Sequence, residues 1–162
     1  MFNLKAEFYL KIIFLFSFIA LISAFFIEYI LGHQPCNLCL IERIPYGLSI
    51  MIIMAIFLIR KNLRFLVMLL ILTFIFSFAI SFYHFGIEQG FFQESSVCGA
   101  KSSTEIVTKE DLLKQLSEKT ISCKDVTFRI FGLSLTSINI LISLLFVTIL
   151  SKVFIIYEKN RH

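Results

Sequence analysis

The sequence contains no tryptophan, only 2 prolines and 6 glycines, and charged residues occupy just 16% of its 162 positions. Soluble globular domains carry charge at about a quarter of their residues, so this scarcity argues against that class. Hydrophobic residues reach 58%, phenylalanine alone occurs 20 times, and the mean hydropathy is +0.89. The composition therefore indicates a protein whose main solvent is a lipid bilayer.

The chain also lacks the motifs of several cofactor and nucleic-acid binding proteins. No G-x-G-x-x-G run occurs, and no solvated segment is long enough to form a domain for NAD or FAD. The net charge of +4 is modest, and no basic tract interleaved with aromatic residues lies in a solvated segment. Nucleic acid is therefore not expected as a partner, whereas membrane lipid is.

Four long apolar runs predict four transmembrane helices, and hence an all-α membrane protein folded as a four-helix bundle. A spanning helix needs about 20 mostly apolar residues. The predicted spans cover residues 8–31, 40–59, 65–83 and 130–151 of a single domain, 1–162. The first run could also be a signal peptide, but no polar cleavage region follows Ala24, so a retained anchor is favoured.

Four spans place both termini and the turn between the second and third spans on one side of the membrane. The loops 32–42 and 84–129 lie on the other side. Three short segments on the terminal side hold eight of the 15 basic residues: Lys5, Lys11, Arg60, Lys61, Arg64, Lys152, Lys159 and Arg161. The positive-inside rule therefore predicts cytoplasmic termini. All four cysteines then face the outer, oxidising compartment.

The long outer loop is expected to contain a short amphipathic helix. Thr108-Lys109-Glu110-Asp111 has the spacing of a capping box, and leucines at 112, 113 and 116 share one helical face. We expect a helix over about residues 108–118. It would lie on the membrane surface or against the bundle, or would simply order the loop.

The segment Cys36-Asn37-Leu38-Cys39 is a C-x-x-C pair at the outer mouth of the second span. Such pairs are redox-active more often than structural, because their short ring is strained and one thiolate is readily stabilised. A structural zinc site is disfavoured because the second half of the chain has no C-x-x-C spacing. Covalent haem is excluded because Leu40, not histidine, follows the pair.

Cys98 and Cys123 lie 25 residues apart in the long loop and allow two interpretations. A bridge between them would restrict the unfolded chain by about 3 kcal/mol in the chain-entropy account. Alternatively, this pair exchanges with a soluble partner and passes electrons to Cys36 and Cys39. The C-x-x-C pair on the same face favours the relay.

Two further residues are candidates for the chemistry of the cysteines. Arg43 follows Cys39 by about one helical turn and could stabilise its thiolate, or could simply extend to the interface. Glu42 would oppose that effect if it pointed the same way. His84 ends the third span at the outer level, where it could bind a ligand head group or cap the helix. Since a two-electron acceptor must come from outside the chain, a lipid-soluble quinone is the expected cofactor.

A set of short motifs follows the order found in one known family. The motifs are Gln34-Pro35-Cys36-Asn37-Leu38-Cys39, Glu42-Arg43, Tyr83-His84-Phe85-Gly86-Ile87-Glu88, Cys98, Cys123, Phe131-Gly132-Leu133-Ser134-Leu135 and Asn139. Together with the four spans and the loop lengths, they resemble the DsbB family of bacterial inner-membrane disulfide oxidoreductases over essentially the whole chain. The resemblance is strongest at the first cysteine pair and Arg43.

The resemblance implies a quinone-dependent relay. Cys98 would exchange with a periplasmic thioredoxin-fold oxidase similar to DsbA. Cys123 would exchange with Cys36, and Cys39 would meet the quinone, ubiquinone or menaquinone.

The implied quinone site contains Arg43 beside Cys39. His84 matches a histidine that the family has near the quinone. Glu88 stands one turn later, where some members carry glutamine, and is a further candidate for the cofactor site.

Two alternatives remain at the level of the sequence. The vitamin K epoxide reductase family also combines loop cysteines with a C-x-x-C in a four-helix bundle, but there the C-x-x-C comes last, whereas here it comes first. A non-catalytic membrane subunit with two structural disulfides is the other alternative.

Overall fold

The computed structural model describes residues 4–59, 62–94, 98, 122–124, 129–130 and 132–159. These residues form four long helices: α1 (Leu4–Tyr29), α2 (Asn37–Ile59), α3 (Leu63–Glu88) and α5 (Leu135–Lys159). Each is long and apolar enough to cross a membrane. The shortest, with 23 residues, extends about 35 Å, which exceeds the ~30 Å hydrocarbon core of a bilayer. The predicted all-α, four-helix architecture is confirmed.

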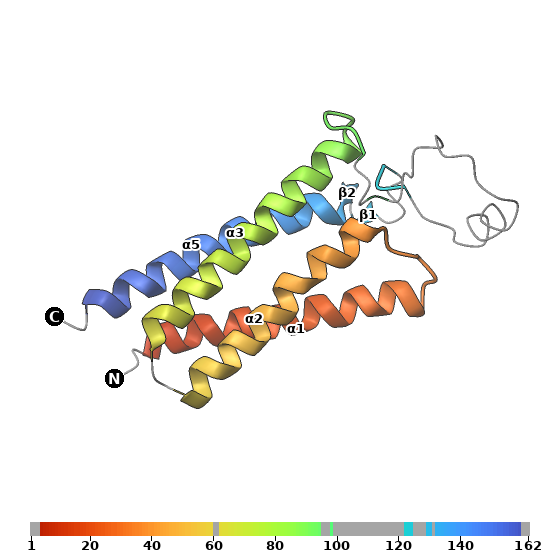
Figure 1. Ribbon diagram of the computed structural model, residues 1–162. Coiled ribbons are helices and arrows are strands. Elements are labelled where there is room, and N and C mark those ends of the chain that lie inside the picture. The colour runs from red at the N-terminus through yellow and green to blue at the C-terminus, as the bar shows by residue number, and fades with distance from the viewer. Residues whose placement is uncertain are drawn as a thin grey trace, which may run out of the picture.

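The helices run side by side, with the N- and C-terminal ends at one end of the bundle (Figure 1). The last turn of α2 and the first turn of α3 lie at the same end. α3 packs against both α2 and α5, and α1 lies against α2 and α5. The last turns of α1 and α3 and the first turns of α2 and α5 therefore lie at the opposite end of the bundle, as Figure 1 shows.

Apolar side chains fill the half of the bundle near the termini. Phe74 of α3 is fully buried. The centre of its ring lies 5.0 Å from the ring centre of Phe146 of α5 and 6.2 Å from that of Tyr46 of α2. Small polar residues bring the helices together at the same depth: Ser49 donates to Ser17, 3.0 Å away. Many large apolar side chains remain exposed on the outer faces, as expected where lipid is the solvent.

The end of the bundle opposite the termini differs in detail from the expected spans. α3 continues through residue 84 to Glu88, past the expected span end at residue 83. A two-stranded antiparallel hairpin, β1 (Arg129–Ile130) and β2 (Leu133–Ser134), precedes α5. Gly132 adopts a positive φ of 83° in its turn, which glycine allows without steric cost. α5 therefore begins at Leu135, later than the expected start at residue 130. The predicted amphipathic helix at 108–118 lies outside the described residues.

The chain leaves α3 by folding back over its last turn. The carbonyl of Gly86 accepts hydrogen bonds from the backbone N–H groups of Phe91 (2.8 Å) and Phe92 (3.1 Å). The Phe92 ring stacks on Tyr83 with centroids 5.7 Å apart. This ring occupies the space in which a side chain at position 86 would lie, since a Cβ there would be 2.1 Å from it. The absence of a side chain at Gly86 thus lets the chain turn back beside the cysteines.

Candidate functional site

The C-x-x-C pair lies at the beginning of α2. Cys36 precedes the first helical residue and is buried, while Cys39 lies in the first turn and is half-buried. Their Sγ atoms are 2.7 Å apart, and the backbone N–H of Cys39 donates to the Cys36 sulfur at 3.3 Å. The helix start therefore brings both thiols together and points one backbone donor at Cys36.

These contacts favour the thiolate form of Cys36. The hydrogen bond from the Cys39 thiol has the largest effect, burial opposes it, and the His84 side chain adds to it. Together they lower the pKa of Cys36 from the ordinary thiol value of 9.0 to about 4. Since the thiolate is the nucleophile in disulfide exchange, Cys36 is suited to that chemistry.

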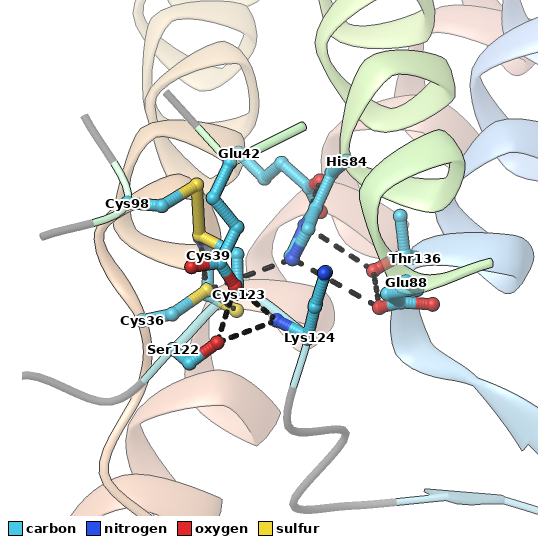
Figure 2. Close-up of a disulfide and its surroundings, with 11 residues drawn as sticks. Cys36, Cys39, Glu42, His84, Glu88, Cys98, Ser122, Cys123, Lys124 and Thr136 are labelled. Carbon is cyan, nitrogen blue, oxygen red and sulfur yellow. Dashed lines mark hydrogen bonds and ion pairs between the residues drawn. A yellow bond between two sulfur atoms is a disulfide. The ribbon is translucent and has the colours of Figure 1, made fainter. Parts of the chain in front are cut away.

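His84 lies next to Cys36 although it belongs to α3. Its Nε2 atom is 3.6 Å from the Cys36 sulfur, and its Nδ1 atom is 2.8 Å from Oε1 of Glu42. An ionised carboxylate only accepts hydrogen bonds, so Nδ1 donates to Glu42 and Nε2 faces the sulfur. The three side chains thus form a thiol, imidazole and carboxylate series (Figure 2), which can hold a proton that leaves Cys36.

A buried hydrogen-bond network supports Glu42 from behind. The side-chain amide of Asn139 on α5 donates to Oε2 of Glu42 at 3.1 Å and contacts the Ser81 hydroxyl at 2.7 Å. Tyr46 donates its hydroxyl hydrogen to the Asn139 carbonyl. Residues from α2, α3 and α5 thereby fix the carboxylate that orients His84. Buried charge within a membrane span needs such partners.

Glu88, one turn after His84, has an incomplete set of partners. The Thr136 hydroxyl donates to its Oε1 atom at 2.6 Å, and Oε1 lies 3.9 Å from His84 Nε2. The side chain is only 5% exposed, yet its Oε2 atom is buried with no hydrogen-bond partner among the described residues. An unpaired buried carboxylate oxygen is costly, so this atom is an acceptor available to a ligand.

Cys98 and Cys123 form a disulfide, and each residue is only 2% exposed. The bridge belongs to the same buried cluster as Cys36, Leu38 and Ile87, against which Cys39 also packs. Figure 2 shows it beside the C-x-x-C pair. Both cysteine pairs therefore lie together at one end of the bundle.

Glu94 ties the segment around Cys123 to the chain that follows α3. Its Oε1 atom accepts hydrogen bonds from the Ser122 hydroxyl and from the backbone N–H of Lys124, the latter at 3.1 Å. The two residues that flank Cys123 are thus held by one carboxylate. No sequence motif singled out Glu94, because the contact joins positions far apart in the loop.

Arg43 contacts groups of α1 as well as belonging to the helix that begins with the C-x-x-C pair. Its guanidinium donates to the Glu28 carboxylate of α1 and lies 5.3 Å from the centre of the Phe25 ring. The expected partner, a Cys39 thiolate, therefore competes with a carboxylate for this cation. The ion pair also joins the end of α1 to the beginning of α2.

Sequence reasoning missed the role of several polar residues. Glu42 was considered only as a charge opposing Arg43, whereas it contacts His84; a carboxylate inside an apolar run was the available signal. Asn139 was noted as a motif residue without a role. Thr136, Ser81 and Tyr46 carried no sequence signal, since their function depends on contacts between helices.

Membrane-length helices, a buried C-x-x-C pair, a second cysteine bridge and an adjacent histidine define a multi-pass membrane protein equipped for thiol chemistry at one end. The sequence model of the family described as "Disulfide bond formation protein DsbB" matches residues 6–153. The chain belongs to the DsbB family and is therefore a membrane protein of disulfide-bond formation. This also decides between the two families that the sequence left open.

One similar protein is an uncharacterized protein of Rickettsia prowazekii (strain Madrid E). It is 30% identical over 147 residues, which cover 90% of this chain and 86% of the relative. No solved structure matches the chain.

Proposed function

We propose that this protein is a thiol:quinone oxidoreductase that reoxidises a periplasmic thioredoxin-fold disulfide oxidase similar to DsbA. The observation that carries the proposal is the joint burial of both cysteine pairs in one cluster at one end of the bundle. Thiol–disulfide exchange needs sulfur atoms that can approach one another. A chain with two such pairs can pass two electrons from a soluble dithiol to the membrane.

The proposed relay begins at the loop bridge. A thiolate of the partner attacks Cys98, the Cys98–Cys123 bond breaks, and Cys123 leaves as a thiolate. Cys123 then attacks Cys36 of an oxidised C-x-x-C, and the bond between Cys36 and Cys39 breaks. The second thiol of the partner displaces Cys98, which releases the oxidised partner. Cys98 returns to Cys123 and displaces Cys36, so that the loop bridge is restored and two electrons remain on the C-x-x-C thiols.

The residues beside the C-x-x-C pair fit a bound quinone. When bound, a quinone supplies a sink for two electrons and two protons. The unpartnered Oε2 atom of Glu88 is a buried acceptor suited to a quinol hydroxyl, and the Nε2 atom of His84, which faces Cys36, can take up the Cys36 proton as the pair is reoxidised. Arg43 lies at the same end of the bundle on α2. We assign His84, Glu88 and Arg43 to the quinone site. The bound quinone would be ubiquinone or menaquinone.

The proposed location is the bacterial inner membrane, with cytoplasmic termini and the cysteine end in the periplasm. The bundle has both termini at one end and the cysteine cluster at the other. The basic residues Lys11, Arg64 and Lys152 lie in the halves of α1, α3 and α5 nearest the terminal end, and the positive-inside rule favours a cytoplasmic face there. The cysteines then meet an oxidising compartment in which disulfides persist.

One observation, the burial of the loop disulfide, fits a non-catalytic structural role as well as the relay. Cys98 and Cys123 are each 2% exposed, and a purely structural bridge would be buried in the same way. The free Cys36 and Cys39 thiols beside His84 favour catalysis, because a structural pair needs no imidazole next to its sulfur.

The test is an anaerobic reaction of the oxidised protein in detergent with quinone and a reduced thioredoxin-fold oxidase. Quinone absorbance and the free thiols of the partner are followed together. Loss of partner thiols matched by quinol formation supports the proposal when Cys36→Ser and Cys98→Ser abolish both signals. Glu7→Gln is the matched control, because Glu7 pairs with Lys11 at the start of α1, at the other end of the bundle from the cysteines. This variant should retain both the loss of partner thiols and the formation of quinol. Unchanged thiols and quinone in the unmodified protein would refute it.

A further inference from the structure

We infer that the reduced Cys36 and Cys39 thiolates, together with His84, form a binding site for a thiophilic divalent cation such as Zn²⁺. Among the described residues, the Sγ atoms of the two cysteines and a ring nitrogen of His84 all lie within 4.8 Å of one another. The sequence disfavoured zinc because no second C-x-x-C follows. The structure supplies the third ligand from α3 instead.

One of the ligand-to-ligand distances already matches a tetrahedral zinc site, and a second needs a small side-chain movement. With Zn–S and Zn–N bonds of about 2.3 and 2.05 Å, the sulfur and nitrogen ligands of a tetrahedral ion stand about 3.6 Å apart. The distance from Cys36 Sγ to His84 Nε2 is 3.6 Å. Two sulfur ligands would stand about 3.8 Å apart, whereas the Cys36 and Cys39 sulfurs are 2.7 Å apart. A rotation of the Cys39 side chain that moves its sulfur by about 1 Å supplies the difference.

The surroundings of His84 are those of a metal-binding histidine. A ligand imidazole usually donates its other N–H to a carboxylate, which fixes the tautomer and raises the basicity of the ligating nitrogen. The Nδ1 atom of His84 makes this contact with Glu42 at 2.8 Å. Glu42 is in turn held by Asn139 at 3.1 Å. Nε2 is thereby directed toward the sulfur atoms before any cation arrives, and it can ligate the cation once its own proton has left.

Charge also favours a divalent cation at this position. Two thiolates in a buried cluster repel each other and are poorly solvated, and a cation of charge +2 neutralises both. The carboxylate of Glu88 lies 3.9 Å from His84 Nε2 and adds negative charge. Three protein ligands leave the fourth tetrahedral position open, as in zinc sites with two cysteines and one histidine.

Binding and disulfide formation exclude each other, because both use the same sulfur atoms. Entry of the cation displaces to solvent the protons still held by the two sulfurs and by His84 Nε2, and it transfers no electrons. Closing the Cys36–Cys39 bond removes both thiolate ligands and releases the cation. The site therefore exists only in the reduced protein, where a bound cation holds the pair reduced and prevents its reoxidation.

Binding can be measured without a partner or quinone, so it does not depend on the proposed relay. A Cys98→Ser, Cys123→Ser background leaves only the C-x-x-C thiols. Cd²⁺ is titrated into this protein under anaerobic reducing conditions, the thiolate-to-cadmium absorbance is followed, and Zn²⁺ is added as a competitor. We expect one Cd²⁺ per chain in the reduced protein and none after oxidation of the pair.

Two matched variants separate a three-ligand site from a bare dithiol. His84→Gln should weaken binding at least tenfold, whereas His33→Gln, which changes a histidine outside the cluster, should leave it unchanged. Glu42→Gln should weaken binding about tenfold through the orientation of His84.

A second measurement uses the unmodified full chain. Zn²⁺ should protect Cys36 and Cys39 of the reduced protein from modification by maleimide, and a chelator should reverse the protection. Mass spectrometry of the protein measures how many thiols have been modified. Equal Cd²⁺ binding by the oxidised and reduced proteins, or equal affinity of His84→Gln and His33→Gln, would overturn the inference. Modification of both thiols at the same rate with and without Zn²⁺ would also overturn it.

Discussion

The Nε2 atom of His84 lies 3.6 Å from the sulfur of Cys36, although 48 positions separate the two residues in the sequence. The contact joins the last turns of α3 to the residue that precedes α2. Because Glu42 holds the opposite ring nitrogen, the imidazole cannot turn away without breaking a buried hydrogen bond. This pair of residues links the disulfide chemistry of the family to the polar interior of the bundle.

The ionisation of Cys36 provides the first prediction. In the reduced protein that retains only Cys36 and Cys39, ultraviolet thiolate absorbance should titrate with a midpoint near pH 4, far below the ordinary value of 9.0. His84→Ala should raise this midpoint, since the His84 contacts lower the pKa of Cys36. A midpoint that is the same with and without His84 would contradict the geometry.

The same shift predicts how the stability of the reduced protein depends on pH. The pKa of Cys36 is lowered in the folded state, so the unfolded chain binds more protons between the two pKa values. The stabilisation is fully present above about pH 9 and is lost as the pH falls toward about 4. Chemical unfolding of the reduced protein at a series of pH values measures this slope, and Cys36→Ser should flatten it.

The buried carboxylate of Glu42 provides a test of how far the polar network stabilises the protein and the Cys36 site. Glu42→Leu removes an acceptor of both His84 and Asn139. His84 Nδ1 then keeps only the Thr136 hydroxyl at 3.3 Å and the Asn139 amide only the Ser81 hydroxyl, so we expect a cost of about 1–3 kcal/mol. We expect a lower midpoint of thermal unfolding in detergent and slower reaction of the Cys36 thiol. Glu7→Leu removes a carboxylate of the same size from a partly exposed pair with Lys11 and should change neither quantity by a comparable amount.

The close approach of Phe92 to Gly86 gives a packing prediction. A Cβ at position 86 would lie 2.1 Å from the Phe92 ring, so Gly86→Ala must displace that ring from Tyr83. We expect a loss of about 1–3 kcal/mol, as for other overpacked sites, read from unfolding midpoints. Gly47→Ala is the control, because a Cβ there meets nothing within 4 Å and alanine favours a helix by about 1 kcal/mol over glycine. Equal effects of the two substitutions would rule out the packing argument.

The loop bridge provides a prediction that separates relay from scaffold. Cys123→Ser should leave Cys98 able to form a long-lived mixed disulfide with a thioredoxin-fold partner, visible as a heavier species on non-reducing gels. The lost bridge, which joins residues 25 positions apart, should also cost roughly 3 kcal/mol of stability. Loss of stability without any trapped partner would favour the structural interpretation.

Hydrophobic runs were sufficient to predict the membrane architecture. Spanning helices need continuous apolar sequence, and each backbone group must be satisfied within its own helix, so local sequence determines where the chain can cross. Helix ends were predicted less well, because residues 84–88 of α3 are stabilised by burial of His84 and Glu88 against other helices. The start of α5 depended on the turn at Gly132, which interrupts an otherwise apolar run.

The sequence by itself determined the four spanning helices, the C-x-x-C pair and the family motifs, since each depends on residues close together in the chain. Only the tertiary structure decided which groups meet. Glu42 faces His84 instead of opposing Arg43, Arg43 pairs with Glu28, and Glu88 keeps an unpartnered oxygen. The physical reason is that these contacts depend on how α1, α2, α3 and α5 pack, and a buried charge or polar group takes whichever partner that packing brings within reach.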